Sequence, residues 1–388
     1  MNIAADTSTV RVSDVRTGVS TEKDPGQAVA EFVRHVSQPG MALVVVFASP
    51  EFDRRELAAH LVRSFPDCPV IGCTTSGEIT PGGYSENSLT GFSLSGAHAQ
   101  VTTCTIGPLK DLQPLSLHGL SQRVKERVAG YHQAHAEARD FALFFVDGMS
   151  GKEEDAVALV HQALGDIPLI GGSAGDNLDF DRTWVLSDGE FVTDAAVLAV
   201  VSTVLPFETF KTQHFLPTDT KLVITEADPS TRTVYEINGL PAAEEYARLI
   251  GIAPDELVPT VFSRYPVMLR IGGEYYVRSL QRRNADGSLT FYCAIDNGLV
   301  LTIARGVDIV ENLREALAGV AAGINQPQLL ITCECVLRRL EVIETGLTGP
   351  INDILVRHGA IGFHSYGEQF NAIHVNQTFS GVMVGQMS

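Results

Sequence analysis

A unit of apolar strand, helix-like stretch, second apolar strand and glycine-containing turn occurs three times along this chain, and each copy closes on a further apolar run. The strand, turn and closing segments are residues 43–47, 70–78 and 87–94 in the first copy, 143–147, 169–176 and 196–201 in the second, and 329–333, 360–368 and 377–384 in the third. A supersecondary unit that repeats describes a scaffold before it describes a reaction. The chain is therefore predicted to be built from three related β-α-β units.

The strands that open the three copies, at Leu43, Leu143 and Leu329, are short and almost entirely apolar. Strands of this kind are usually covered on both faces. Apolar residues at helical spacing over 51–65 and 153–164 predict the helices that cover them. We therefore expect an α/β fold with mixed sheets.

Residues 205–300 have a different pattern, in which short strands alternate with turns. Asn238 with Gly239 and Gly272 with Gly273 are typical hairpin signals, and they predict an antiparallel meander. We predict two layered domains, one over residues 25–205 with two repeat units and one over residues 206–388 with the meander and the third unit.

Composition narrows the class of protein. The chain has 388 residues, 45% of them hydrophobic, and a formal net charge of −18. This charge argues against binding to nucleic acid or to an anionic membrane. There is no apolar stretch of the ~20 residues that a spanning helix needs, and the first residues lack a signal-peptide pattern. Six cysteines without framework spacing suit reduced thiols, so we expect a cytoplasmic protein.

In each repeat a first and a last glycine bracket the turn, and an acid follows the last one: Glu78, Asp176 or Glu368. Glycine permits a positive φ or a close backbone approach, and the carboxylate can accept hydrogen bonds from turn amides. These turns are interpreted as structural turns that carry their own side-chain cap. The alternative is that the three turns converge around a ligand.

Residues 171–175 match the G-x-S-x-G nucleophile elbow, with Ser173 as the nucleophile. That motif must lead into a helix, whereas residues 177–185 have the pattern of loop and strand. The other two turns also lack a serine in the same position. A hydrolase is therefore disfavoured, and we predict that the protein is not an enzyme.

Cys333 and Cys335 end an apolar strand and could bind zinc together with His358 or His364. Alternate residues of a strand share one face, so both cysteines are more typical of a buried core. Cys68, which precedes a proline, resembles a regulatory haem motif, but proline also commonly opens a strand. Structural roles are favoured for these cysteines.

Three histidines stand out as candidate axial ligands of a haem iron: His374, His214 and His364. A haem iron takes a neutral imidazole as its proximal ligand, and arginines can pair with the propionates. The absence of a C-x-x-C-H motif means that any haem would be held noncovalently. Candidate arginines in the C-terminal half are Arg264, Arg270, Arg278, Arg338 and Arg339.

From about residue 25 onward the chain resembles the FIST proteins, two-part sensory modules of bacterial signalling. The segments that carry the resemblance are residues 70–78, 169–177, 234–239, 335–341, 361–368 and 376–378. Residues 279–281, 291–296 and 374–378 carry a narrower likeness to stand-alone members that sense nitric oxide through haem and act beside histidine kinases and cyclic-di-GMP circuits.

This resemblance implies a cytoplasmic sensor that binds b-type haem in its C-terminal domain and responds to nitric oxide. His374 is the first choice as iron ligand, with His214 second and His364 third, and Arg338 and Arg278 are placed near the cofactor. The implied protein partner is a histidine kinase or a cyclic-di-GMP enzyme, and a homodimer is left open.

The alternative is a haem-free sensory module that binds a small ligand such as an amino acid. In this hypothesis the glycine turns supply backbone amides and Arg338 pairs with a carboxylate. The sequence leaves both hypotheses open.

Overall fold

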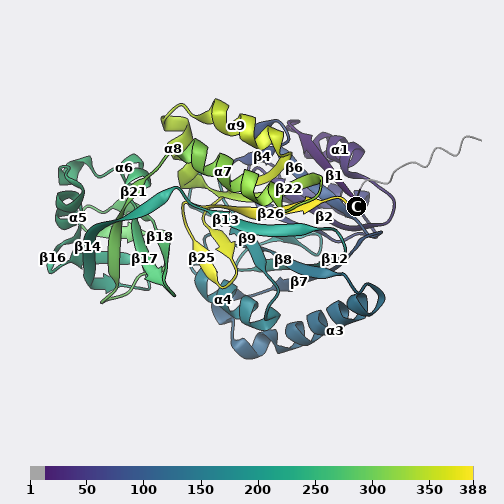
Figure 1. The fold of residues 1–388 in the computed structure, drawn as a ribbon, viewed down its shortest axis with the longest axis horizontal. Coiled ribbons are helices and arrows are strands. Elements are labelled where there is room, and N and C mark those ends of the chain that lie inside the picture. Colours follow the sequence, from purple (N-terminus) through teal and green to yellow (C-terminus); the bar gives the residue numbers. More distant parts are fainter. Residues whose placement is uncertain (1–13, 388) are drawn as a thin grey trace, which may run out of the picture.

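The computed structural model describes residues 14–387. Three six-stranded sheets pack around one core, and a fourth, eight-stranded sheet forms a separate lobe (Figure 1). We call the three sheets with their helices the core body, and residues 215–306 the satellite lobe. The predicted α/β class with mixed sheets is confirmed.

Each repeat unit is longer than predicted, because an edge strand, followed by a helix, precedes the β-α-β motif. Unit 1 contains β1 (Val15–Ser20), α1 (Pro25–Val36), β2 (Met41–Ala48), α2 (Arg54–Ser64), β3 (Val70–Thr74), β4 (Glu78–Thr80), β5 (Gly83–Ser85) and β6 (Leu89–Ser95). The sheet therefore begins before residue 25, which is the predicted start of the first domain.

Units 2 and 3 follow the same plan. Unit 2 contains β7 (Ala99–Ile106), the 3-10 turns Leu109–Asp111 and Pro114–Leu117, α3 (His118–Ala134), β8 (Arg139–Val146), α4 (Glu153–Leu164), β9 (Leu169–Ser173), β10 (Val185–Ser187), β11 (Glu190–Val192) and β12 (Ala196–Thr203). Unit 3 contains β13 (Phe207–Thr212), α7 (Ile309–Ala322), β22 (Pro327–Cys335), α8 (Val336–Glu344), α9 (Thr348–Arg357), β23 (Ala360–Ser365), β24 (Glu368–Phe370), β25 (Ile373–Val375) and β26 (Phe379–Gly385). The satellite lobe is inserted between β13 and α7 of unit 3.

Aspartates define where several of these helices begin. Asp24 accepts a hydrogen bond from the Gln27 amide at 2.9 Å, and Asp53 accepts one from the Glu56 amide at 2.8 Å. Asp308 does the same at the start of α7. Each carboxylate satisfies an amide that the first helical turn leaves without a partner.

The three units exchange their hairpins in a closed ring. The sheet orders are β1-β6-β2-β3-β10-β11, β25-β24-β9-β8-β12-β7 and β13-β26-β22-β23-β4-β5. The hairpin of unit 2 thus completes the sheet of unit 1, that of unit 3 completes the sheet of unit 2, and that of unit 1 completes the sheet of unit 3. Each unit depends on the other two for its last pair of strands.

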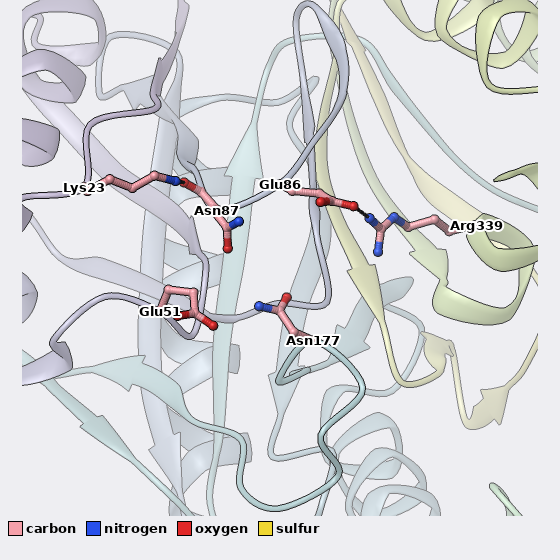
Figure 2. A pocket seen from close by; sticks show the side chains of 6 residues that line it. All are labelled: Lys23, Glu51, Glu86, Asn87, Asn177 and Arg339. Atoms are coloured by element: carbon pink, nitrogen blue, oxygen red, sulfur yellow. Dashed lines mark hydrogen bonds and ion pairs between the residues drawn. The ribbon is translucent and has the colours of Figure 1, made fainter.

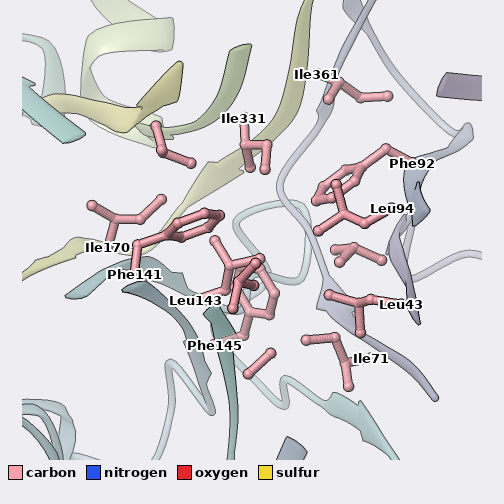
Figure 3. Packing of buried hydrophobic residues seen from close by; sticks show 14 of the residues in the cluster. Leu43, Ile71, Phe92, Leu94, Phe141, Leu143, Phe145, Ile170, Ile331 and Ile361 are labelled. Carbon is pink, nitrogen blue, oxygen red and sulfur yellow. The ribbon is translucent and has the colours of Figure 1, made fainter. Parts of the chain in front are cut away.

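The inner faces of the three sheets form one hydrophobic core (Figure 3). At its centre the Phe47 ring lies 5.4 Å from that of Phe145 and 4.8 Å from that of Phe363. Each ring stands opposite a small residue of the neighbouring parallel strand in the same unit. The opposed pairs are Phe47 with Cys73, Phe145 with Gly172, and Phe363 with Cys333.

The satellite lobe confirms the predicted antiparallel meander and has a hydrophobic core of its own. Two helices and a 3-10 turn accompany its strands. Its elements are β14 (Phe215–Asp228), β15 (Thr233–Ile237), β16 (Leu240–Pro241), α5 (Ala242–Ile250), the 3-10 turn Pro254–Glu256, α6 (Pro259–Arg264), β17 (Val267–Ile271), β18 (Glu274–Arg278), β19 (Leu280–Arg283), β20 (Leu289–Phe291) and β21 (Val300–Gly306).

Within residues 14–387, no helix combines the length and the apolar character needed to cross a membrane.

Candidate functional site

The glycine that opens each repeated turn sits against the backbone of the neighbouring parallel strand. A Cβ on any of these three glycines would overlap a carbonyl oxygen of that strand, so the position accepts only glycine without backbone movement. The glycine and carbonyl pairs are Gly72 with Val46, Gly171 with Phe144, and Gly362 with Thr332. The role of these glycines is therefore close packing.

Two of the three acids that follow the turns close the base of a hairpin. The Glu78 carboxylate accepts hydrogen bonds from the hydroxyls of Thr75 and Ser88, the latter at 2.6 Å. Glu368 accepts the corresponding hydroxyl bonds from Ser365 and Thr378. The predicted side-chain cap is confirmed for this pair.

Asp176 is not equivalent to the two glutamates, although it follows a glycine in the same way. Its carboxylate accepts from the backbone amides of Phe180, Asp181 and Arg182 at 3.0, 2.8 and 2.9 Å. It therefore caps the longer loop of unit 2, and Val185 stands in the sheet where units 1 and 3 have the acid.

The three turns do meet, but they bond to one another. The Ser76 amide donates to the His364 carbonyl at 3.0 Å, and the Gly175 amide donates to the Thr74 carbonyl at 3.0 Å. The Tyr366 hydroxyl donates to Asp176. These contacts use the backbones of the turns, and the side chains of Asp176 and Tyr366 are buried. The junction of the three turns therefore has a structural role, because it holds the ends of the strands together.

Ser173 does not form a nucleophile elbow. It ends β9, is fully buried, and its hydroxyl accepts a hydrogen bond from Gln369 Nε2 at 2.8 Å. The following residues form a loop that continues into β10, so the serine does not lead into a helix as the motif requires.

Cys333 and Cys335 are both buried, but they belong to different hydrophobic clusters. The expectation that they share one core is therefore wrong. Among residues 14–387 there is no group of three or more histidine, cysteine or acidic side chains with the arrangement of a metal site.

His214 uses both ring nitrogens within the protein. Nε2 lies 2.9 Å from Glu341 Oε2, and Nδ1 lies 2.7 Å from Arg338 Nη1. Because Arg338 can only donate, Nδ1 is the acceptor and Nε2 carries the proton. Burial lowers the pKa of His214, so its imidazole is neutral. It connects the residue that precedes β14, at the start of the satellite lobe, to α8.

Arg338 is fully buried and forms an ion pair with Glu334 at 3.3 Å. Glu334 also accepts a hydrogen bond from the Tyr84 hydroxyl at 2.6 Å. In this conformation Arg338 holds together hairpin β4–β5, strand β22 and His214. Its Nη2 has no hydrogen-bond partner among the described residues.

His364 is also fully buried, and neither ring nitrogen has a hydrogen-bond partner among the described residues. Its Nδ1 lies 3.5 Å from Glu334 Oε2, and the Tyr84 ring packs against its edge. Burial, together with the positive charge of Arg339, lowers the pKa of His364 well below its ordinary value.

His374 has one free nitrogen. Gln369 donates through Nε2 to Ser173, so its Oε1 faces His374 Nδ1 at 3.1 Å and Nδ1 is the donor. Nε2 is then an acceptor without a partner in the described part of the chain. Burial lowers the pKa of His374 to about 4.

Two of the three histidines present no accessible ring nitrogen to a haem group in this conformation. A haem ligand needs a free imidazole nitrogen that faces a space large enough for the macrocycle. His214 has no free nitrogen. The free Nε2 of His374 is blocked by backbone, because it faces Gly367 so closely that a Cβ there would overlap the ring.

A cavity of about 720 Å³ lies between the core body and the satellite lobe. The core body contributes the loop and first turn of α4 over residues 148–155, together with Phe180 and Tyr366. The lobe contributes residues 229–232, Gln281, Arg282, residues 290–292 and Ala294. We call this cavity the lobe cleft.

Charged side chains bridge the lobe cleft. Arg232 of the lobe pairs with Glu153 and Glu154 of α4, each at 2.8 Å. Glu154 also accepts a hydrogen bond from the Ala294 amide at 2.6 Å. Burial raises the pKa of Glu153 to about 7. The two bodies are thus joined by a small, partly buried charge cluster.

A second cavity, of about 470 Å³, is lined by residues of unit 1 together with Asn177 of unit 2 and Arg339 of unit 3 (Figure 2). Most of its charged side chains have partners, as do most of those in the lobe cleft. Glu86 pairs with Arg339, and Lys23 donates to the Asn87 carbonyl at 3.1 Å. Its lining residues are Lys23, Glu51, Glu86, Asn87, Asn177 and Arg339. The lobe cleft is larger and has aromatic walls, so it is the stronger candidate site.

Of the predicted site residues, Arg278 lies near the lobe cleft, 4.0 Å from Glu154, and His374 is close enough for the charges of Glu154, Arg232 and Arg278 to act on it. Sequence reasoning missed Arg232, Glu153 and Glu154. The sequence does contain one signal for this site: residues 147–152 follow an apolar strand and precede a helix. Ligands of α/β proteins commonly bind at such carboxyl ends of strands.

The FIST N domain family matches residues 42–240, and the FIST C domain family matches residues 242–371. The chain is also similar to the uncharacterized protein MJ1623 of Methanocaldococcus jannaschii, with 23% identity over 93% of this chain and 76% of that protein. FIST domains are sensory signalling modules rather than catalytic ones. These two matches span residues 42–371, and the chain belongs to the FIST family.

Proposed function

We propose that this protein is a sensor that binds a small dipolar molecule, such as an amino acid, in the lobe cleft. The observation that carries the proposal is the lining of the cleft by both bodies and by both signs of charge. Lys152, Arg232 and Arg282 supply positive groups, and Glu154 and Asp155 supply negative ones. An amino acid carries one group that complements each sign.

Aromatic side chains give the same cleft an apolar wall. Phe180 stacks on Tyr366, with ring centroids 4.8 Å apart, and lies 5.9 Å from Tyr292. A cavity with aromatic walls and a few polar groups is typical of small-molecule sites. The apolar part of an amino acid would pack against these rings.

Binding in the cleft supplies a signal because the ligand would contact the core body and the satellite lobe together. A ligand shifts a conformational equilibrium only by as much as it prefers one state. A closed cleft offers more contacts than an open one, so occupancy favours closure. A histidine kinase or a cyclic-di-GMP enzyme in the cytoplasm is the proposed receiver, and dimerisation remains part of the proposal.

The test is thermal unfolding with each of the twenty L-amino acids, on the wild type and two matched variants. Arg282 lines the cleft, whereas its neighbour Arg283 is exposed outside it. We expect at least one amino acid to stabilise the wild type and the Arg283→Gln variant, and to lose most of its effect on Arg282→Gln. The absence of any stabilisation, or equal effects on the two variants, would contradict the proposal.

Haem-based sensing of nitric oxide is a second candidate, and one observation favours it. His374 has the tautomer of a proximal ligand, with Nδ1 donating to Gln369 and Nε2 unpartnered among the described residues. When bound, haem would supply the iron that takes up nitric oxide. Entry of the haem requires the base of hairpin β24–β25 to open, because Gly367 covers Nε2 of His374.

An absorption spectrum of protein purified from haem-replete cells separates the two candidates. A Soret band that is lost in the His374→Ala variant would support haem and count against the dipolar ligand. Colourless protein that does not take up added haemin would exclude the haem hypothesis.

A further inference from the structure

Arg278 is a buried cation whose hydrogen-bonding capacity is largely unused. The residue is 7% exposed, and its Nε and Nη1 have no hydrogen-bond partner among the described residues. The nearest carboxylate oxygen, Glu154 Oε1, lies 4.0 Å from Nη1. Buried charges are normally paired and hydrogen-bonded, because an unpaired one loses its hydration without compensation.

The carboxylates nearby are already committed to other groups. Both Glu153 and Glu154 pair with Arg232, and Glu154 also accepts from the Ala294 amide. Neither glutamate is within hydrogen-bonding distance of Arg278, so its guanidinium keeps free donors for a further acceptor.

Arg278 stands directly behind the wall of the lobe cleft. Glu154, Tyr292 and Ala294 line the cleft, and the Tyr292 amide donates to the carbonyl of Ser279, the residue next to Arg278, at 3.0 Å. The Ser279 hydroxyl is also buried and without a partner in the described structure. Arg278 and Ser279 are thus consecutive residues with buried, unpartnered donors, and they adjoin the cleft-lining residues Glu154 and Tyr292.

We propose that Arg278 binds the carboxylate of a ligand at the back of the lobe cleft, with the Ser279 hydroxyl as a second donor. Guanidinium and carboxylate groups match in geometry and form strong charge-assisted hydrogen bonds. A carboxylate fits this position better than a phosphate, because it adds less negative charge beside the carboxylates of Glu153 and Glu154. This inference rests on the proposed function of the cleft and names the ligand group that the cleft anchors.

The experiment follows the Nε–Hε signal of Arg278 by nuclear magnetic resonance in the full-length protein. The signal is assigned by its absence from the Arg278→Lys variant, with the exposed Arg270→Lys as the matched control. Sodium acetate is titrated at ionic strength fixed with sodium chloride, and sodium phosphate is titrated in a separate series. We expect a saturable shift of the Arg278 signal with acetate and no such shift with phosphate.

Thermal unfolding in the same solutions gives a second measurement. Acetate should stabilise the wild type and Arg270→Lys, and Arg278→Lys should bind acetate ~10-fold more weakly, because lysine keeps the charge but loses the two-point guanidinium contact, a loss of about one hydrogen bond. The inference is overturned if the Arg278 signal does not respond to acetate, if phosphate alone shifts it, or if Arg278→Lys binds acetate as tightly as the wild type. An acetate response with no response to any amino acid would refute the proposed ligand class and leave the Arg278 site standing.

Discussion

Single residues of this protein are constrained by backbone packing and by burial of polar groups. The sequence predicted that the repeated glycines serve either a positive φ or a close backbone approach. Gly72, Gly171 and Gly362 use the second, whereas Gly77 and Gly367 have φ of 109° and 139°. Residue type and spacing indicated that glycine was needed, but only the register of the parallel strands shows the reason.

Replacing Gly171 by alanine should destabilise the protein by about 3 kcal/mol or more, because the added methyl meets backbone and not a movable side chain. Gly319→Ala is the control, since Gly319 lies in α7 with open space around it. This variant should gain about 0.5–1 kcal/mol from helix propensity. Urea unfolding measures both changes, and an unaltered midpoint for Gly171→Ala would refute the packing argument.

His374 should make the protein sensitive to mild acid. Its pKa is lowered from 6.5 to about 4 by burial, while Glu154 opposes that shift and Arg232 and Arg278 add to it. The unfolded chain therefore binds the proton first as the pH falls. Stability is complete above pH 6.5 and decreases by about 3 kcal/mol as the pH falls toward 4.

Unfolding free energies of the wild type and His374→Gln between pH 7 and pH 4 test this prediction. The difference between the two proteins should change across that window, because the variant lacks the titrating group. His118→Gln, at an exposed position in α3, should keep the wild-type pH dependence. If His374→Gln keeps it too, the buried-histidine account is wrong.

The secondary-structure elements themselves were predicted better than the pairing of strands between units. Periodicity indicated the β-α-β strands and the meander, because a buried strand or helix face leaves a pattern in its own sequence. The exchange of hairpins leaves no such pattern, since β4–β5 has the same alternation whichever sheet it completes. The edge strand β1 was missed because it is short and lies in a polar stretch.

Hairpin β4–β5 should depend on the hydrogen bond from Tyr84 to Glu334 in the sheet it joins. Tyr84→Phe leaves the buried Glu334 carboxylate with one donor fewer, and we expect a loss of about 1.5–3 kcal/mol. Tyr235→Phe is the matched control, because Tyr235 is 40% exposed on the satellite lobe. Chemical unfolding that gives equal midpoints for the two variants would show that this bond does not anchor the hairpin.

At the scale of the whole molecule, the core body should fold as one cooperative unit. The predicted boundary near residue 205 lies between β12 and β13, yet hairpins β4–β5 and β24–β25 each complete a sheet on the other side of it. A fragment of residues 14–205 lacks β24–β25 on the edge of β9 and lacks β23 beside β4. We expect this fragment to remain unfolded.

A fragment of residues 213–307 is the matched comparison, because the satellite lobe is continuous in sequence and has its own hydrophobic core. We expect it to fold alone. Circular dichroism and amide proton dispersion distinguish the outcomes. A cooperatively folded 14–205 fragment would show that the exchanged hairpins are dispensable and that residue 205 separates two folding units.

The central claim is that a small ligand binds between the core body and the satellite lobe. Hydrogen exchange of the full-length protein, with and without a pool of the twenty L-amino acids, tests it most directly. The account predicts slower exchange in both walls of the lobe cleft together, over residues 148–155 of the core body and residues 229–232 and 281–294 of the lobe. Unchanged exchange in both walls, or protection confined to the cavity around Glu51 and Asn177, would contradict it.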